Sequence, residues 1–413
     1  MDDPTTPLEQ LRATFREHLL LPDPSVVDFT VAVAVANRLG GDPVWAFVVA
    51  PPSSGKTETL QSLTRLAEVY PMSSLTANTF LSGAKKAEKD GKSASLLERL
   101  PNGTLLMLKD FGTILSLRED ARAEILSQLR EIYDGSLVKD FGTGRHIEWH
   151  GRLGFMAGTT PAIDVHHAVI ATLGERFLYF RAPAADRKET SRRSLHVRDE
   201  AEMRGELQVA VFEFMRDLDL TERPEVAGAV EDRIVNVADI VTWARTAVYR
   251  DRFTRDIEVA PEPEGAPRFA KQLGSLWRAL TVMGHEDPLA LVCRVALDSM
   301  PPARSAALTK LATAGIVSST DLRKVTRLSQ SASRRVLEDL EALRLVEIVE
   351  HGGAGVASTW GLTDNGLLTW KEGFADYLDS LPQYQGRGER GEDIENVDVA
   401  GATSGGWMSL LAP

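Results

Sequence analysis

The chain has 413 residues, enough for two or three domains of roughly 100–200 residues, and its 43% hydrophobic and 26% charged residues are typical of a globular protein. No apolar run approaches the ~20 residues that span a bilayer, and the acidic start Met1-Asp2-Asp3 lacks the basic region of a signal peptide. The single cysteine, Cys293, excludes a disulfide framework or a cysteine zinc site. We therefore expect a cytoplasmic protein with no membrane partner. The net charge of −12 excludes binding to nucleic acid through the overall field, so any such binding needs a local basic patch or a pore.

The first half of the chain alternates short apolar runs with helical patterns. Residues 1–28 predict an N-terminal helical segment, and residues 29–39 predict a second helix. Four apolar runs follow, at 44–49, 105–108, 153–157 and 177–180. Short apolar runs separated by helices are typical of buried parallel strands, so we predict an α/β core over 29–185, with a parallel sheet between layers of helices.

A phosphate-binding motif follows the first of these runs. Ala50-Pro51-Pro52-Ser53-Ser54-Gly55-Lys56-Thr57 has the spacing of the Walker A motif G-x-x-x-x-G-K-[ST], with Ala50 in place of the first glycine. In such a loop backbone N–H groups surround the phosphates, Lys56 reaches the β- and γ-phosphates, and the Thr57 hydroxyl ligates Mg²⁺. We therefore predict that Ala50 to Glu58 bind ATP and Mg²⁺; a chance match is disfavoured by the strand before the loop and the helix expected over 58–70.

A carboxylate follows the second run. Asp110 is predicted to lie at the carboxyl end of its strand, where it holds Mg²⁺ together with Thr57, and a strand-capping aspartate is the alternative. Many ATPases of this class follow that Asp with a Glu that polarises the attacking water, but position 111 is Phe. Glu58 and Glu119 are the other candidate bases, so the sequence supports nucleotide binding more strongly than hydrolysis.

These motifs resemble the AAA+ ATPase superfamily over about residues 25–285. The resemblance implies that Gly154 to Pro161 contain the sensor-1 strand, with Thr159 or Thr160 near the γ-phosphate. It also implies that Arg176, in Leu173-Gly174-Glu175-Arg176-Phe177, is an arginine finger that reaches the nucleotide of a neighbouring subunit, and hence a homo-oligomeric ring. The alternative for Arg176 is a structural ion pair with Glu175 or Asp164.

The same resemblance implies an all-helical lid after the core, here 186–300. We expect helices at 196–218, 231–253 and 268–284, and no strand between 186 and 285. A lid of this kind supplies a sensor-2 arginine, for which Arg245 is the candidate and Arg204 the alternative.

Two strand-like segments around Gly142-Thr143-Gly144 predict a β-hairpin after a helix over 119–133. The hairpin resembles the pre-sensor-1 insertion of minichromosome-maintenance and viral superfamily-3 helicases, in which it grips the nucleic-acid backbone inside a ring. The resemblance implies that Lys139, Arg145 and His146 contact DNA. A solvated hairpin with incidental charges is the alternative. Phe141 is an aromatic residue of the hairpin, so a ring whose pore remodels proteins is a further alternative.

Residues 301–375 look like a winged helix, with three helices followed by strands around Gly-rich residues 352–355. In a helix-turn-helix the start of the third helix meets the DNA, which predicts contacts from Gln330, Ser333, Arg334 and Arg335; a protein-binding module is the alternative. Residues 376–413 predict a disordered tail, whose apolar end at 407–411 either docks on a protein partner or has no role.

The sequence thus predicts an AAA+ ATPase that couples ATP binding and hydrolysis to DNA binding or remodelling, in a helicase-like or replication-associated role. The alternative is a nucleotide-gated switch that binds DNA or protein with little ATP turnover.

Overall fold

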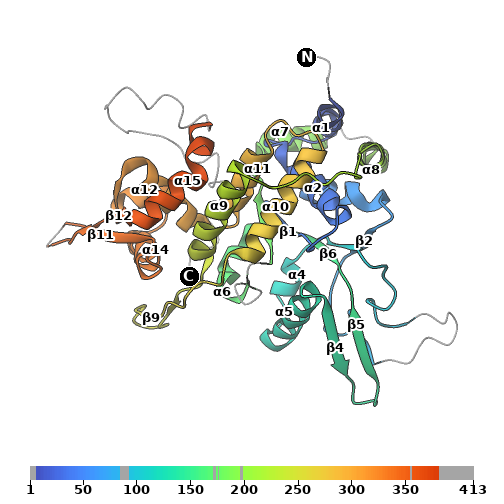
Figure 1. The fold of residues 1–413 in the computed structure, drawn as a ribbon, viewed down its shortest axis with the longest axis horizontal. Helices are drawn as coiled ribbons and strands as arrows, with labels where there is room; N and C mark the ends of the chain where they lie inside the picture. The colour runs from blue at the N-terminus through green and yellow to red at the C-terminus, as the bar shows by residue number, and fades with distance from the viewer. Residues whose placement is uncertain are drawn as a thin grey trace. The chain divides into compact units, whose positions relative to one another are not determined.

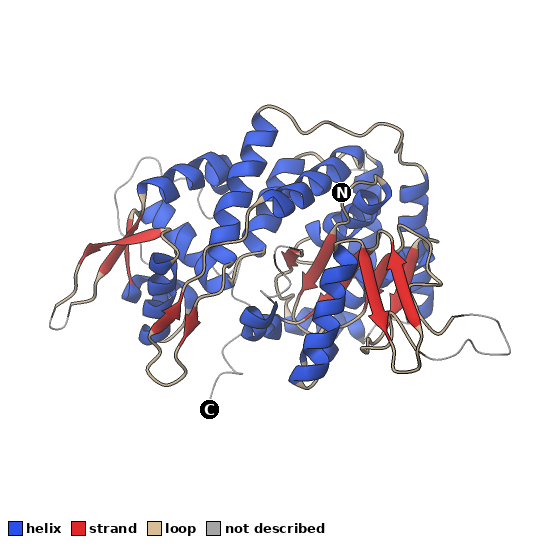
Figure 2. Cartoon of the chain, turned by 60° about the horizontal axis from the view of Figure 1, so that its bottom comes forward, coloured by secondary structure: helices blue, strands red, loops and turns tan. Residues whose placement is uncertain are grey.

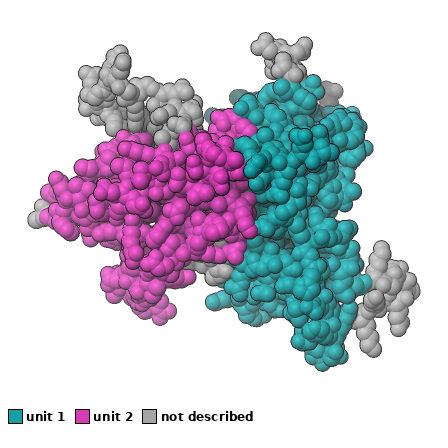
Figure 3. Space-filling view, viewed as in Figure 1, with its two compact units in different colours: residues 1–225, 275–286 teal, residues 226–274, 287–413 magenta. Residues whose placement is uncertain are grey.

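The computed structural model describes residues 6–83, 93–170, 174, 176–195, 199–353 and 356–380 (Figures 1 and 2). The chain divides into two compact units, which Figure 3 distinguishes by colour. Unit 1 comprises residues 1–225 and 275–286, and unit 2 comprises residues 226–274 and 287–413. None of the described helices combines the length and the apolar character needed to cross a membrane.

Unit 1 is an α/β body. Its elements in chain order are α1 (Pro7–His18), α2 (Ser25–Arg38), β1 (Trp45–Val49), α3 (Lys56–Gln61), the 3₁₀ helix η1 (Ser62–Arg65), β2 (Val69–Met72), β3 (Leu105–Leu108), α4 (Gly112–Leu115), α5 (Glu119–Tyr133), β4 (Ser136–Asp140), β5 (His146–His150), β6 (Gly154–Thr159), η2 (Pro161–His166), α6 (His167–Ile170), β7 (Leu178–Arg181), α7 (Arg187–Ser194) and α8 (Glu200–Arg216).

Unit 2 contains α9 (Ala229–Arg245), β8 (Tyr249–Arg250), β9 (Ile257–Val259), α11 (Pro288–Asp298), α12 (Pro302–Ala314), β10 (Ile316–Ser318), α13 (Ser319–Thr326), α14 (Gln330–Ala342), β11 (Val346–Glu350), β12 (Thr359–Leu362) and α15 (Asp364–Ser380). The helix α10 (Pro267–Val282) begins in unit 2 and ends in unit 1.

The predicted parallel sheet is confirmed. Five strands pair in the order β2-β3-β6-β1-β7, all parallel to their neighbours. Alternate residues of these buried strands pack on opposite faces. On one face Phe47 stacks on Phe177 and meets Phe111 edge-on, in a cluster that includes apolar residues of α5. On the other face Phe180 stacks on Phe29 of α2, so helices cover both faces.

The edge strand β2 was not predicted from the sequence. A helix was expected over 58–70, but α3 ends at Gln61, η1 ends at Arg65, and Val69–Met72 form a strand. Pro71 lacks an N–H and is therefore confined to edge strands, and β2 is at the edge of the sheet. The predicted helix was too long because the local pattern does not show that Val69–Met72 pair with β3.

The predicted hairpin is confirmed as β4–β5, an antiparallel pair that extends beyond the parallel sheet in Figure 1. On one of its faces Leu137 and Ile147 are buried in the core of unit 1. The opposite face carries exposed Val138, Asp140 and His146.

Residues 186–300, expected as one helical lid, are divided between the units. The helix α8 packs on α1 and η1 in unit 1, whereas α9 packs along α15 in unit 2. The expectation of no strand was wrong, because α9 ends at Arg245 and β8 and β9 form a short hairpin. Its turn begins at Asp251, whose carboxylate accepts the amides of Phe253 and Thr254 at 2.7 and 2.6 Å, a local bond that competes with helix.

The C-terminal part of unit 2 has the three expected helices, α12, α13 and α14, and an antiparallel sheet in the order β10-β12-β11. Buried Arg304 fixes α12 in place, since it donates to the carbonyl oxygens of Ala244 and Thr246 at 3.0 and 2.6 Å and to Asp339 at 3.2 Å. The helix α15 continues to Ser380, beyond the predicted boundary at 375, and its Trp370 and Phe374 are buried. Residues 354–355 of the expected wing and 381–413 of the tail lie outside the described residues.

Candidate nucleotide site and nucleic-acid interfaces

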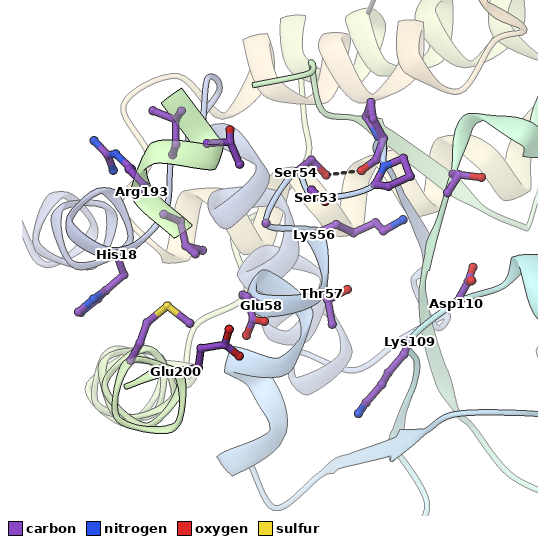
Figure 4. Close-up of a pocket in the computed structure, with 18 residues that line it drawn as sticks. His18, Ser53, Ser54, Lys56, Thr57, Glu58, Lys109, Asp110, Arg193 and Glu200 are labelled. Atoms are coloured by element: carbon purple, nitrogen blue, oxygen red, sulfur yellow. Dashed lines mark hydrogen bonds between the residues drawn. The ribbon is translucent and has the colours of Figure 1, made fainter. Parts of the chain in front are cut away.

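A cavity of about 620 Å³ lies in unit 1 at the carboxyl ends of the parallel strands (Figure 4). The predicted loop residues 51–58 line it, and so do Asp110 and Thr160. Ala50 does not line the cavity, but its carbonyl oxygen accepts from Lys56 Nζ at 3.4 Å. The fold therefore brings together the phosphate loop, the carboxylate after β3 and the threonine after β6, which are up to 110 residues apart in the chain.

The backbone of the loop contains two residues in the left-handed region. Ser53 and Gly55 both adopt positive φ, 61° and 76°, and the Ser54 hydroxyl donates to the Pro51 carbonyl at 2.8 Å. Left-handed residues that alternate with right-handed ones can turn successive N–H groups toward one concave side, where they can donate hydrogen bonds to an anion. A Cβ at Gly55 would also lie 3.1 Å from Leu21 Cδ2, so glycine suits both the dihedral angle and the space.

Lys56 is held at the ends of two strands by neutral partners. Its Nζ donates to the Thr159 carbonyl at 2.7 Å as well as to that of Ala50, so in this structure it is tethered without a salt bridge. Burial lowers the pKa of Lys56 below its ordinary value of 10.5, and the negative charge of Asp110 offsets part of that shift. Gly158 makes the approach possible, because a Cβ there would lie 2.7 Å from the Lys109 carbonyl oxygen and 3.3 Å from Lys56 Cδ.

The oxygen atoms expected to hold Mg²⁺ share this cavity. Thr57 and Asp110 both line it, and Asp110 Oδ1 accepts the Gly112 amide at 2.8 Å. Among the described residues no group of three or more His, Cys, Asp and Glu is arranged to hold a metal ion. One carboxylate and one hydroxyl fit Mg²⁺ bound largely through phosphate and water oxygens, which is the way this ion usually binds.

The candidate bases are placed less favourably. Glu58 lines the cavity, but both of its carboxylate oxygens accept from Arg204, at 2.8 and 3.0 Å, and this pairing raises the pKa of Arg204. Glu119 is at the start of α5 and does not line the cavity. Phe111 is fully buried in the aromatic cluster, so the position after Asp110 contributes no polar group.

Several residues of the cavity carried no recognisable signal in the sequence. They come from the end of α1 and from α7 and α8, and they are His18, Leu19, Leu20, Thr190, Arg193, Glu200 and Met203. In Figure 4 His18, Arg193 and Glu200 lie on one side of the loop, and Asp110 lies on the other. Lys109, beside Asp110, was also missed. Local spacing could not have found these residues, because most are more than 100 residues from the loop or lie before it.

Arg176 and Arg245, the two predicted AAA+ arginines, lie outside the cavity. Arg176 is 5% exposed, donates to Asp134 at 2.6 Å and stacks over Tyr133. This is the structural ion pair considered as the alternative, with Asp134 as the partner; Glu175 is outside the described residues, and Asp164 pairs with Arg181 instead. Arg245 is buried in unit 2, where its guanidinium lies over Phe269.

The three predicted DNA contacts of the hairpin all have acidic partners. Lys139 pairs with Glu124 at 2.9 Å, Arg145 with Glu98 at 3.1 Å, and His146 with Asp140 at 2.7 Å. The hydrogen bond to Asp140 raises the pKa of His146. Lys139 and Arg145 therefore tie the hairpin to Glu124 and Glu98 outside it, whereas His146 pairs with Asp140 across the hairpin itself.

The four predicted contacts on α14 differ from one another. Ser333 is 0% exposed and cannot reach a surface ligand, so that prediction is corrected: it lies on the face of α14 that packs inward. Gln330 is exposed but donates to the hydroxyls of Ser319 and Thr320, at 2.7 and 3.1 Å. Arg334 is 67% exposed with Glu338 as its partner, and Arg335 is half-buried.

A wider basic face surrounds the start of α14. We define it by its cations, of which Arg335 is half-buried and the others are exposed: Arg323, Lys324, Arg327, Arg334 and Arg335. Residues 319–335 contain these five cations and one carboxylate, Asp321, giving a net charge of +4 in a chain of net charge −12. The sequence analysis missed the three cations of α13 and its end, although their spacing could have indicated them.

Comparison with known proteins adds no relative: no protein-family model matches the sequence, and no curated protein is significantly similar to it.

Proposed function

We propose that this chain is an AAA+-type ATPase that binds ATP with Mg²⁺ in the cavity of unit 1 and couples nucleotide binding to DNA binding or remodelling. One observation carries the proposal. Lys56 is tethered only by carbonyl oxygens in the described contacts, beside a loop whose two left-handed residues suit a nest of amides, so its positive charge remains available to an anion.

The residues of the cavity would have different roles in nucleotide binding, according to their chemistry. The nest and Lys56 would hold the β- and γ-phosphates, while Thr57 and Asp110 would hold the Mg²⁺ shell. Thr160 lines the same cavity after β6 and is suited to hydrogen-bond the terminal phosphate. Leu19, Leu20 and Met203 give the cavity an apolar side, which suits a nucleobase more than water.

The DNA-binding part of the proposal rests on unit 2. The order of α12, α13, α14 and the three-stranded sheet supports a winged helix, and the basic face supplies the local patch that an acidic chain needs. The ring assembly remains a proposal without support from Arg176, which is engaged by Asp134 within its own chain.

The first test is nucleotide binding by the wild-type chain and by Lys56→Ala, measured with a fluorescent ATP analogue in Mg²⁺. Losing charge-assisted hydrogen bonds to two phosphates is expected to raise the Kd by on the order of 100-fold. Lys371→Ala, on the exposed side of α15, is the matched control and should leave the Kd unchanged. Equal affinities of wild type and Lys56→Ala would contradict the proposal.

A nucleotide-gated switch with little turnover is the second candidate. It is favoured by two observations already described: Glu58 is bound by Arg204, and Phe111 is buried where other ATPases place a catalytic Glu. Phosphate release with and without single- and double-stranded DNA separates the candidates. DNA-stimulated release that is lost in Lys56→Ala supports a motor, whereas tight binding with no release above the Lys56→Ala level supports a switch.

A further inference from the structure

We propose that the acidic segment 389–398 of this chain docks on the basic face of unit 2 and competes there with DNA. The docking depends on charge and tether length alone, and the competition also rests on the proposed function.

The basic face has more positive charge than its own carboxylates offset. Asp321 is committed to the cap of α13, where it accepts from the backbone amide and the hydroxyl of Ser318 at 3.1 and 2.7 Å, and it lies 3.6 Å from Lys324. Glu338 is shared between Arg334 and Arg250, at 2.8 and 3.2 Å. Lys324 is 74% exposed, and Arg323 is also exposed, so the surface presents cations to a ligand.

The segment 389–398 has the complementary charge. Its sequence, Glu-Arg-Gly-Glu-Asp-Ile-Glu-Asn-Val-Asp, contains five carboxylates and one arginine, for a net charge of −4. That value matches the +4 of residues 319–335 with opposite sign. Carboxylates spaced along an extended chain can meet arginines in the same way as the phosphates of a nucleic-acid backbone do.

The tether is long enough and remains within one unit. The helix α15 ends at Ser380 and packs against α12 and β12, and α12 also contacts α13 and α14, which carry the basic face. Eight residues separate Ser380 from Glu389, and this stretch of chain can span up to about 30 Å when extended. A domain of about 80 residues, the size of the module from α12 to α15, has a radius of gyration of only about 12 Å, so the length of the tether is comparable with the diameter of the module.

Tethering makes a weak contact effective. A short flexible linker gives an effective concentration in the millimolar range, so a segment with an intrinsic Kd near 0.1 mM would occupy the face about nine-tenths of the time. Competition of that strength weakens DNA binding by about tenfold at low salt. Because both contacts are between opposite charges, the difference should shrink as salt is raised.

The docking is tested directly on the full chain with a carbodiimide, which couples a lysine to a carboxylate in contact, followed by peptide mass spectrometry. Coupling of Lys324 to residues 389–398 should exceed coupling of Lys371 several-fold, although Lys371 is exposed on α15 and is closer in sequence. Coupling at Lys324 should fall in 0.5 M salt and should disappear in Lys324→Arg, which keeps the charge. An equal mixture of isotopically labelled and unlabelled chains distinguishes coupling within one chain from coupling between copies.

The competition is tested by the anisotropy of a labelled DNA duplex with a full-length variant whose tail acids are neutralised: Glu389→Gln, Glu392→Gln, Asp393→Asn, Glu395→Gln and Asp398→Asn. This variant should bind about tenfold more tightly than wild type at about 50 mM salt. A control variant changes net charge equally by neutralising five exposed acids of unit 1: Asp120, Glu131, Glu213, Glu222 and Glu225. It should gain much less, because only the general field changes.

The outcomes separate the two proposals. Coupling at Lys324 within one chain together with a tenfold gain supports the full inference. No preference for Lys324, or coupling only between copies, overturns the docking whatever the DNA result. Equal DNA affinity of wild type and the neutralised variant overturns the competition and leaves DNA binding in place. Coupling at Lys324 with no DNA binding by any variant supports the docking and overturns the DNA-binding part of the proposed function.

Discussion

The phosphate loop and the β4–β5 hairpin both present basic residues that the sequence assigned to anionic ligands, but their surroundings differ. Lys56 is bonded to two backbone carbonyl oxygens, at 2.7 and 3.4 Å. Lys139, Arg145 and His146 are each bonded to a carboxylate.

The difference concerns how far the neighbours of each cation offset its charge. A carbonyl oxygen orients an ammonium group without neutralising it, so its charge still acts on a ligand. A carboxylate removes most of the local field, and a phosphate must then compete with it. Lys56 has neutral partners in the described contacts, whereas the three cations of the hairpin have carboxylate partners.

The largest expected effect comes from packing behind the loop. In Gly158→Ala the new Cβ would lie 2.7 Å from the Lys109 carbonyl oxygen, so the strands must shift, at an expected cost of about 1–3 kcal/mol in the free energy of unfolding. Lys56 would be displaced as well, and nucleotide affinity should fall. The matched change in the hairpin is Gly142→Ala, where nothing lies within 4 Å of the new Cβ. Urea unfolding and nucleotide titration of both variants measure the contrast; equal stabilities would contradict the packing argument.

Substitution of Arg176 tests how much its ion pair with Asp134 stabilises the base of the hairpin, because Asp134 immediately precedes Gly135 and Ser136, where β4 begins. Arg176→Ala is expected to destabilise unit 1 by about 1–2 kcal/mol, a value limited because Asp134 is 47% exposed and remains solvated. Arg118→Ala, at an 87% exposed side chain, should cost little in the same urea titration. An arginine finger would give the reverse: reduced turnover in mixtures with wild type and no loss of stability.

The hairpin cations should contribute little to DNA affinity. Lys139→Gln combined with Arg145→Gln is expected to change the Kd for DNA by less than about twofold and to leave its salt dependence unchanged, because each cation already has a carboxylate partner. Each true phosphate contact that is lost would reduce the salt slope by about 0.9. A measured reduction near that value per residue would restore the role of the hairpin in gripping DNA.

The smallest effect near neutral pH concerns the titration of Lys56. Its pKa is lowered in the folded chain, so the unfolded state binds more protons at alkaline pH, and this group's contribution to stability becomes more favourable as pH rises through the lowered pKa. Phosphate binding needs the protonated form, so nucleotide affinity should fall over the same alkaline range, below the usual 10.5. Calorimetry in buffers of different ionisation enthalpy should detect proton uptake on nucleotide binding there. No uptake would indicate that Lys56 is fully protonated before the ligand binds.

The sequence by itself determined the parts that depend on local pattern. The apolar runs became β1, β3, β6 and β7, because a buried strand needs only a short run of apolar residues bounded by polar ones. The loop 50–57 was recognisable because its glycine, lysine and threonine need fixed spacing to surround a phosphate. The hairpin followed from its Gly-rich turn, and the three helices of the C-terminal module followed from their local pattern, whereas the cap of α13, Ser318, was seen only in the structure.

Only the tertiary structure decided which charged side chains pair with one another and how the chain divides into two units. Glu58 and Arg204 are 146 residues apart, and no spacing rule indicates that the second neutralises the first. The same holds for Arg176 and Asp134, and for the division of 186–300 between two units. Local pattern identifies which side chains are charged, but whether a charge is left available for a ligand depends on which distant groups pack against it.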